Sequence, residues 1–434
     1  MKKMLLGSLA VLAMQVSVQA QTINVNFAHF AGKEYVYLLE RGDKKDTIAK
    51  GKLDETGKTI IIIPASKKGY AGVSNFVLTD GGGMDFTINN ENFTVSCKEE
   101  QPNFENTKYT GSPENEFIND WVKKQGELLA KARAIQGGLA AYNKEETFYL
   151  ALEKEKENLN RELKALKTST AESKLYAAKL TEIYAVLMGA SGSLDSSELE
   201  SAQEINVFVR DKLDMTVLYN SGQWSNLIEG WMQLQQSIIK DDTAWFAGTK
   251  QILSRIKSNE IYTAFTEKVV ILFTKAGRDG MVAAISEYAQ NSGRLEKPTQ
   301  RLLNTINSPL IGVAAPALQT AAGKKKINKK TLLFFYESGC DLCENEIYQL
   351  IDNYKIVKSK GYEIISVAAD MTKDAADGHN HTFPWKEQLC DYKGFAGPNF
   401  QTYAIIGTPT FFTIDEKGKI TGKYARLIDT NILK

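Results

Sequence analysis

The first part of the chain alternates between apolar and polar positions in short runs that are separated by turns. Every second residue is apolar from Ile23 to Phe27 and again from Met84 to Ile88. Continuous apolar runs stand at 35–39 and 59–63. Glycine and aspartate mark turns between the runs, at 42–43, 55–57 and 80–83. Short strands at this spacing predict an antiparallel β-sandwich or barrel, which we place at residues 21–111.

From Ser112 onward, apolar residues recur at helical spacing instead. Ser112 followed by Pro113 is the pairing of N-cap and first-turn residue that begins a helix. One apolar stripe consists of Phe148, Leu152, Leu159, Leu163 and Leu166. Breaks divide the segment into about seven or eight helices, and they lie at 189–193, 220–222, 241–242 and 277–280. This pattern predicts an all-α domain at residues 112–309.

The helical segment carries no recognisable catalytic constellation. Its tryptophans Trp224, Trp231 and Trp245 are expected in the core, and an aromatic groove for a binding partner is the alternative. The charged run Glu153–Glu157 is expected to face solvent. The domain would position its neighbour, hold a partner or dimerise, so a homo-oligomer is compatible with the sequence.

The last part of the chain alternates strands with helices. Residues 331–336 form a run of aliphatic and aromatic side chains after Thr331, which suits a strand buried on both faces. Apolar residues then recur at helical spacing, at Ile347, Leu350, Ile351, Tyr354 and Val357. Further strands are predicted at 363–368, 410–414 and 419–424, and a short helix from Pro384 to near Cys390. We predict an α/β domain at 310–434 whose final helix is short or missing.

Composition excludes some classes of protein. The chain has 53 lysines and arginines against 52 aspartates and glutamates, and this balance does not indicate a nucleic-acid partner. Its four cysteines are too few for a disulfide scaffold of 434 residues, so the fold must rest on hydrophobic cores.

The first 20 residues have the pattern of a signal peptide. Lys2 and Lys3 form a basic start, Leu5 to Val18 is a short apolar core, and Val18-Gln19-Ala20 is a small-residue cleavage site. We expect cleavage after Ala20 and a periplasmic or secreted mature chain; an uncleaved anchor is the alternative. No later apolar stretch reaches the roughly 18 residues of a membrane span, so the mature chain is expected to be soluble.

Two cysteines, Cys340 and Cys343, stand where the buried strand leads into a helix. The unpaired N–H groups and the dipole at a helix N-terminus stabilise a thiolate, which is the reactive form. Cys340 would be the exposed attacking thiol, and Cys343 would resolve the mixed disulfide. A Cys-x-x-Cys is also half of a zinc site, but the chain has no second pair at zinc spacing, so we assign no metal.

The negative charges around the two cysteines act against the helix N-terminus, which stabilises a thiolate. Glu337, Asp341, Glu344 and Glu346 surround the pair, and nearby carboxylates raise the pKa of a thiol. We therefore expect only a modest lowering of the Cys340 pKa. A less stable thiolate gives a more stable disulfide and a more reducing couple. This favours a reductase or isomerase over a strong oxidant.

A second motif follows about 70 residues later, where Thr408 and Pro409 precede a strand. The strand, Cys-x-x-Cys, helix, Thr-Pro-Thr and closing hairpin resemble a thioredoxin fold. Glu346, three residues after Cys343, and the Gly-x-x-Ala-Pro at 312–316 resemble the thiol–disulfide oxidoreductases of the cytochrome-maturation type. The resemblance covers residues 310–434.

The resemblance implies roles for individual residues. Pro409 would be cis and pack against a Cys340–Cys343 disulfide, and Thr408 would pair with the substrate backbone. Glu346 would help to move a proton to or from the inner thiol. No cofactor is implied, because the cysteines carry the electrons. The implied partners are client proteins with disulfides and a redox partner that recharges the dithiol.

The sequence departs from the family near the cysteines. Gly339 stands where the family usually has Trp, Asp341-Leu342 replaces Gly-Pro or a similar pair, and Phe334 replaces the buried Asp of cytoplasmic thioredoxins. Peroxiredoxins share the fold but need Thr or Ser three residues before the reactive Cys and Pro four before that. Those positions hold Glu337 and Leu333, so peroxidase chemistry is not expected.

Other features leave alternatives open. Cys97 ends a predicted strand and is expected to be a lone thiol, and Cys390 is expected to be a buried structural thiol; a redox role is the alternative for each. His379 and His381 have a spacing that could bind a transition metal, but a flexible loop is the simpler interpretation. The β segment resembles a domain of unknown function that precedes thioredoxin-like modules in Gram-negative envelope proteins. The competing hypothesis for the whole chain is an envelope binding or assembly protein whose Cys-x-x-Cys is a structural disulfide.

Overall fold

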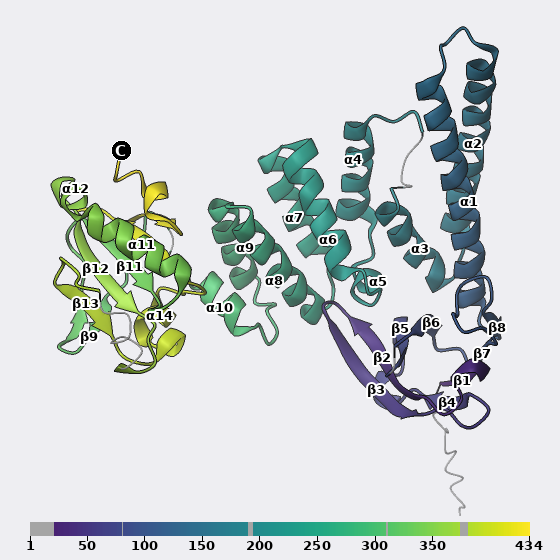
Figure 1. The fold of residues 1–434 in the computed structure, drawn as a ribbon, viewed down its shortest axis with the longest axis horizontal. Helices are drawn as coiled ribbons and strands as arrows, with labels where there is room; N and C mark the ends of the chain where they lie inside the picture. The colour runs from purple at the N-terminus through teal and green to yellow at the C-terminus, as the bar shows by residue number, and fades with distance from the viewer. Residues whose placement is uncertain (1–20, 80, 190–193, 310, 374–380) are drawn as a thin grey trace, which may run out of the picture. The chain divides into compact units, whose positions relative to one another are not determined.

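The computed structural model describes residues 21–79, 81–189, 194–309, 311–373 and 381–434 (Figure 1). The predicted signal peptide therefore lies outside the described residues. The chain forms two compact units, Met1–Ile256 and Lys257–Lys434. The boundary between them falls inside the predicted helical segment, and the division into 21–111, 112–309 and 310–434 stays a prediction. Among the described helices, none combines the length and the apolar character needed to cross a bilayer.

The N-terminal segment is a sandwich of two four-stranded sheets, so the sandwich prediction is confirmed and the barrel alternative is wrong. The first sheet has the order β4 (Lys58–Ile62), β1 (Thr22–Phe27), β7 (Phe93–Cys97), β8 (Lys108–Thr110). The second has the order β3 (Lys44–Lys52), β2 (Glu34–Arg41), β5 (Ala71–Leu78), β6 (Gly83–Asn89). One buried core joins the inward residues of both sheets. All pairings are antiparallel except that of β1 with β7.

Seven α-helices follow in the first unit as the structure describes it. They are α1 (Pro113–Ala141), α2 (Thr147–Glu172), α3 (Tyr176–Leu187), α4 (Glu198–Val207), α5 (Met215–Tyr219), α6 (Trp224–Leu234) and α7 (Asp242–Arg255). Single π-helical turns, η3 (Phe208–Lys212) and η4 (Gln235–Ile239), extend α4 and α6. Ser112 caps α1 by accepting a hydrogen bond from the Asn115 backbone N–H at 3.4 Å, as its sequence position predicts.

The predicted helical cores are mostly confirmed. Trp224, Trp231 and Trp245 are at most 2% exposed, so they are core residues and the aromatic-groove alternative is wrong. Phe148, by contrast, was expected in an apolar stripe but is 52% exposed. It lies in the first turn of α2, where its ring contacts only the nearby Tyr142 ring among the described aromatic pairs, at a centroid distance of 4.8 Å.

The second unit begins with three further helices and ends with an α/β domain. The helices are α8 (Asn259–Lys275), α9 (Asp279–Asn291) and α10 (Gln300–Ile306). Sequence reasoning predicted seven or eight helices where the described residues contain ten, because α5 and α10 are too short to show a periodic stripe. A small hairpin, β9 (Leu318–Thr320) and β10 (Gly323–Lys325), leads into the α/β domain.

The α/β domain has a five-stranded sheet with helices on both faces. Its strand order is β13 (Glu387–Cys390), β12 (Glu363–Ala368), β11 (Thr331–Tyr336), β14 (Thr410–Ile414), β15 (Ile420–Tyr424). The neighbouring helices are α11 (Asp341–Asp352), α12 (Tyr354–Ser359) and α14 (Pro398–Thr402), and the short 3₁₀-helix η6 (Leu427–Thr430) follows the last strand. This confirms the α/β prediction and the short or missing final helix.

The central strand β11 is buried at every position, as predicted. Strands β12 and β13 run parallel to it, while β14 and β15 form the antiparallel hairpin. Because side chains alternate along a strand, Leu333 and Phe335 enter the core that contains Phe400 of α14, and Leu332 and Phe334 enter the core beneath α11. Both faces of β11 are therefore covered.

One predicted element is wrong. The segment from Pro384 to Cys390 was expected to be a short helix, but Glu387–Cys390 is strand β13, paired in parallel with Ile365–Ala368. The Trp385 side chain is buried and its indole N–H donates to Ser366 Oγ at 3.0 Å. Local helix preference is weak, and here pairing at the sheet edge overrides it.

Candidate active site

The two cysteines lie at the C-terminal end of the central strand, where β11 leads into α11 (Figure 1). Cys340 is the N-cap residue of α11 and is half-buried, whereas Cys343 is fully buried at 0% exposed. The predicted order of exposure of the two thiols is therefore confirmed. Gly339 has a φ of +76°, a left-handed conformation that glycine adopts without strain. A tryptophan, which the family usually has at this position, would be strained in this backbone conformation.

The turn before Cys340 is anchored by a carboxylate from the next strand. Asp370 follows β12 and is 4% exposed. Its two carboxylate oxygens accept hydrogen bonds from the Ser338 backbone N–H at 3.0 Å and from Ser338 Oγ at 2.9 Å. The Cys340 N–H donates to Glu337 O at 3.4 Å, which closes the turn. Sequence reasoning missed Asp370, although a carboxylate directly after a buried parallel strand was a usable signal.

The buried thiol of Cys343 is a hydrogen-bond partner of Thr408, one of the two predicted substrate-binding residues. Burial raises the pKa of Cys343 to about 11. Hydrogen bonds from the Thr408 side chain and the Glu337 backbone act in the opposite direction, and the neighbouring Cys340 raises the pKa further. The Thr408–Pro409 peptide bond is cis, as the resemblance implies. The structure thus brings Cys340, Cys343 and Thr408 together.

The structure shows all four cysteines as free thiols. The predicted Cys340–Cys343 disulfide is not formed here and stays a prediction for the oxidised form.

Glu346 lies on the same face of α11 as Cys343, since residues three apart are neighbours on a helix. It is 3% exposed, and its Oε2 accepts a hydrogen bond from the Leu427 backbone N–H at 2.8 Å, at the start of η6. The carboxylate therefore anchors the C-terminal segment to α11. Its predicted role in proton transfer to the inner thiol stays a prediction.

The comparisons with known proteins concern this part of the chain. The family model described as "AhpC/TSA family" matches residues 315–423. The curated thiol-disulfide oxidoreductase ResA of Bacillus thuringiensis subsp. konkukian is 35% identical over 92 residues, which are 21% of this chain and 52% of the relative. ResA of a Bacillus cereus strain is 33% identical over 120 residues, which are 26% of this chain and 68% of the relative. The chain belongs to the thiol–disulfide oxidoreductase family.

The chain spans about half the length of the first of these curated relatives. Among solved structures, a putative thiol:disulfide interchange protein DsbE from Chlorobium tepidum is 26% identical. That alignment covers 29% of this chain and 94% of the other, with a TM-score of 0.25. The family membership rests on the C-terminal part of the chain, where the family model matches residues 315–423.

A contact that the sequence did not indicate links α11 to the segment before β13. The Glu344 carboxylate accepts a hydrogen bond from the Gly339 N–H at 3.0 Å, and His381 Nε2 lies 2.5 Å from its other oxygen. Of the two histidines considered as metal ligands, His379 lies outside the described residues and His381 has this carboxylate partner. No cluster of three metal-binding side chains occurs in the ranges that the structure describes.

The other two thiols of the chain have structural surroundings. Cys97 is buried, with its Sγ 3.3 Å from Asn106 Oδ1. Cys390 ends β13 and its Sγ lies 3.8 Å from Asp370 O, and burial raises its pKa. Both environments fit the structural interpretation, and a redox role for Cys390 stays untested.

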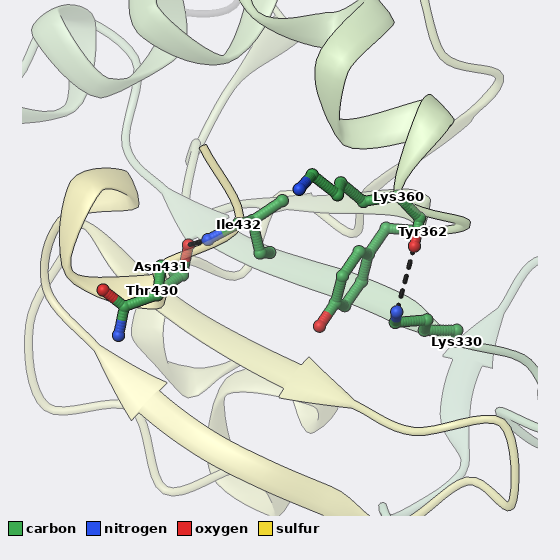
Figure 2. A pocket seen from close by; sticks show the side chains of 6 residues that line it. All are labelled: Lys330, Lys360, Tyr362, Thr430, Asn431 and Ile432. Atoms are coloured by element: carbon green, nitrogen blue, oxygen red, sulfur yellow. Dashed lines mark hydrogen bonds between the residues drawn. The ribbon is translucent and has the colours of Figure 1, made fainter. Parts of the chain in front are cut away.

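Figure 2 shows a separate hollow of about 190 Å³, lined by Lys330, Lys360, Tyr362, Thr430, Asn431 and Ile432. Both ammonium groups are engaged, since Lys330 Nζ donates to Lys360 O at 2.9 Å and Lys360 Nζ donates to Lys434 O at 3.0 Å. Lys330 and Tyr362 immediately precede β11 and β12, whereas Cys340 follows β11. The hollow is therefore at the opposite end of the strands from the dithiol, and we assign it no function.

Proposed function

We propose that the chain is an exported thiol–disulfide oxidoreductase, a reductase or isomerase that exchanges disulfides with client proteins through Cys340 and Cys343. The observation that carries this proposal is the pairing of a half-buried thiol at a helix N-terminus with a fully buried thiol next to Thr408. A structural disulfide does not need one sulfur to be accessible, whereas an exchange enzyme does.

The exchange proceeds in two balanced steps. In the first, the Cys340 thiolate attacks one sulfur of the client disulfide; the client S–S bond breaks, and the leaving client thiolate takes up a proton. In the second, Cys343 loses its proton and attacks the Cys340 sulfur, so that the Cys340–Cys343 bond forms and the second client sulfur leaves. Two electrons have then passed from the dithiol to the client, and a redox partner must return them.

The other predicted site residues, Thr408, Pro409 and Glu346, would each have a role in this exchange. The Thr408 backbone and the cis-bonded Pro409 would align the client chain next to the accessible thiol, because the Thr408 side chain is a hydrogen-bond partner of the buried Cys343 sulfur. Glu346, one turn beyond Cys343, would help to remove the proton of the inner thiol. No further group is required, since the two sulfurs hold the electrons.

Two parts of the proposal rest on the sequence. The pattern of residues 1–20 supports export to the periplasm or the exterior with cleavage after Ala20. The sandwich and the helices of the first unit would hold or orient clients, and a homo-oligomer is compatible with that role. The competing hypothesis is a binding or assembly protein in which Cys340 and Cys343 form a structural disulfide.

The high pKa of the buried thiol predicts a strong pH dependence of the second step. Below pH 11 the thiolate fraction of Cys343 rises about tenfold with each pH unit, so resolution of a mixed disulfide should speed up by about this factor per unit between pH 7 and 10. The reduced chain, with Cys97→Ser and Cys390→Ser, is mixed with Ellman's reagent in a stopped-flow instrument. Release of the second equivalent of chromophore reports attack by Cys343.

Two controls sharpen this experiment. Cys343→Ser must release a single equivalent, which identifies the second phase. Glu346→Gln should slow that phase most at neutral pH, where a local proton acceptor matters most. A second phase with the same rate from pH 7 to 10 would mean that Cys343 is not buried as a neutral thiol, and the proposed division of roles would be wrong.

A further inference from the structure

The Glu344 carboxylate ties the turn before Cys340 to a residue 37 positions further along the chain. Its Oε1 accepts the hydrogen bond from the Gly339 N–H at 3.0 Å, and its Oε2 lies 2.5 Å from His381 Nε2. The His381 tautomer with its proton on Nε2 donates to the carboxylate oxygen in this contact. The two side chains are only 19% and 10% exposed, so the contact is largely shielded from water.

His381 itself rests on a set of packed rings. Its ring meets Tyr348 of α11 edge-on at 5.1 Å between centroids and contacts Phe383 at 5.9 Å. Phe383 packs on Trp385 at 4.6 Å, and Trp385 is fixed by its hydrogen bond to Ser366 of β12. The imidazole is therefore held by the sheet and by α11, which makes it a rigid support for the Glu344 carboxylate.

We propose that His381 is a positioning residue of the dithiol, which acts through Glu344 to hold Gly339 and with it the attacking thiol of Cys340. The inference rests on the proposed exchange function. Ser338 is fixed by Asp370, but Gly339 lies between that anchor and Cys340 in a left-handed conformation. Glycine is the residue with the most backbone freedom, so its N–H is the point where a second anchor limits the motion of Cys340 most.

The consequence is an effect on the stability of the disulfide. Formation of the Cys340–Cys343 disulfide is more favourable when the two sulfurs are already held near one another, because the effective concentration of one thiol at the other is higher. Without the hydrogen bond between Gly339 and Glu344, the Cys340 thiol samples more positions and the disulfide forms less readily. The equilibrium with an external disulfide then shifts toward the dithiol, and the couple becomes less reducing.

The test measures the equilibrium constant of the full chain with glutathione for wild type, His381→Ala and His381→Gln. His381→Ala should lower the constant for disulfide formation about tenfold, which corresponds to a potential about 30 mV less negative. Gln can place an amide N–H near the position of Nε2, so His381→Gln should return to within about twofold of wild type. Lys329→Ala is the matched control: it removes an ion pair with Glu363, 2.9 Å long, at the other end of the same strands, and should leave the constant unchanged.

A double-mutant cycle separates positioning from a general loss of stability. Glu344→Ala should shift the constant in the same direction, and His381→Ala added to Glu344→Ala should have almost no further effect, because both act through one contact. If wild type exchanges thiols with glutathione but His381→Ala and Lys329→Ala both match it, the inference is wrong. Additive shifts from His381 and Glu344 would also contradict it. If wild type itself does not exchange, the proposed function fails instead.

Discussion

Replacing Cys340 with serine should lower the rate of disulfide exchange by about three orders of magnitude or more, because no other residue can take over a lost nucleophile. The fold should persist. Cys340 is the N-cap of α11, and its side chain makes no capping hydrogen bond among the described residues. Serine is a favoured N-cap residue, so the reduced Cys340→Ser chain should match or exceed the reduced wild type in stability, by up to about 1 kcal/mol.

The experiment follows reduction of insulin by the full chain and, in parallel, its thermal unfolding with and without dithiothreitol. Cys390→Ser is the matched control, since it removes a half-buried thiol of the same domain and should leave exchange unaffected. The competing hypothesis predicts the reverse. If Cys340→Ser leaves insulin reduction unchanged and destabilises only the oxidised chain, the cysteines form a structural disulfide and the chain acts through its other domains.

Replacing Phe334 with alanine should destabilise the C-terminal unit by about 3–5 kcal/mol, the usual cost of emptying a buried aromatic site. Phe334 is 0% exposed at the centre of β11. Its ring stacks on Phe411 of β14 at 4.4 Å and on Tyr336 at 5.3 Å. The side chain therefore joins neighbouring strands on the face of the sheet that α11 covers, and truncation would leave a cavity beneath the helix that carries both cysteines.

Because the chain has two compact units, a single unfolding transition cannot be assumed. Hydrogen exchange, measured by mass spectrometry on peptides from β11 and β14, reports the stability of the C-terminal unit directly. Ile428→Ala, which truncates a half-exposed side chain in the same unit, should change protection by less than about 1 kcal/mol. Equal effects of the two substitutions would show that Phe334 does not anchor the core.

The sequence predicted those parts of the fold in which local pattern and burial agree. The six residues of β11, five of them aliphatic or aromatic, are all buried, and the terminal hairpin and the tryptophan core lie where their patterns predict. Strand β3 escaped prediction because none of its residues is buried and lysines fill much of it, which is typical of an edge strand. Strand β13 was mistaken for a helix because its pairing with β12 is not encoded in its own seven residues from Pro384 to Cys390.

The same distinction applies to the site. The spacing of Cys340 and Cys343 at a strand–helix junction was sufficient to predict which thiol is accessible. Asp370 and His381 were missed because they reach the turn before Cys340 only through tertiary contacts, with Ser338 in one case and Glu344 in the other. The position of Asp370 just after β12 was a usable signal for the residue itself, but a single sequence does not indicate which group such a side chain contacts.

The reduction potential of the Cys340–Cys343 pair tests the central claim most directly. The full chain is equilibrated with defined ratios of reduced and oxidised dithiothreitol, and the two redox forms are separated by thiol alkylation and mass. We expect a value of about −200 to −270 mV, the range of reducing oxidoreductases that cycle. A value below about −300 mV would mark a disulfide too stable to exchange. The chain would then be a binding or assembly protein in which the Cys340–Cys343 disulfide is structural.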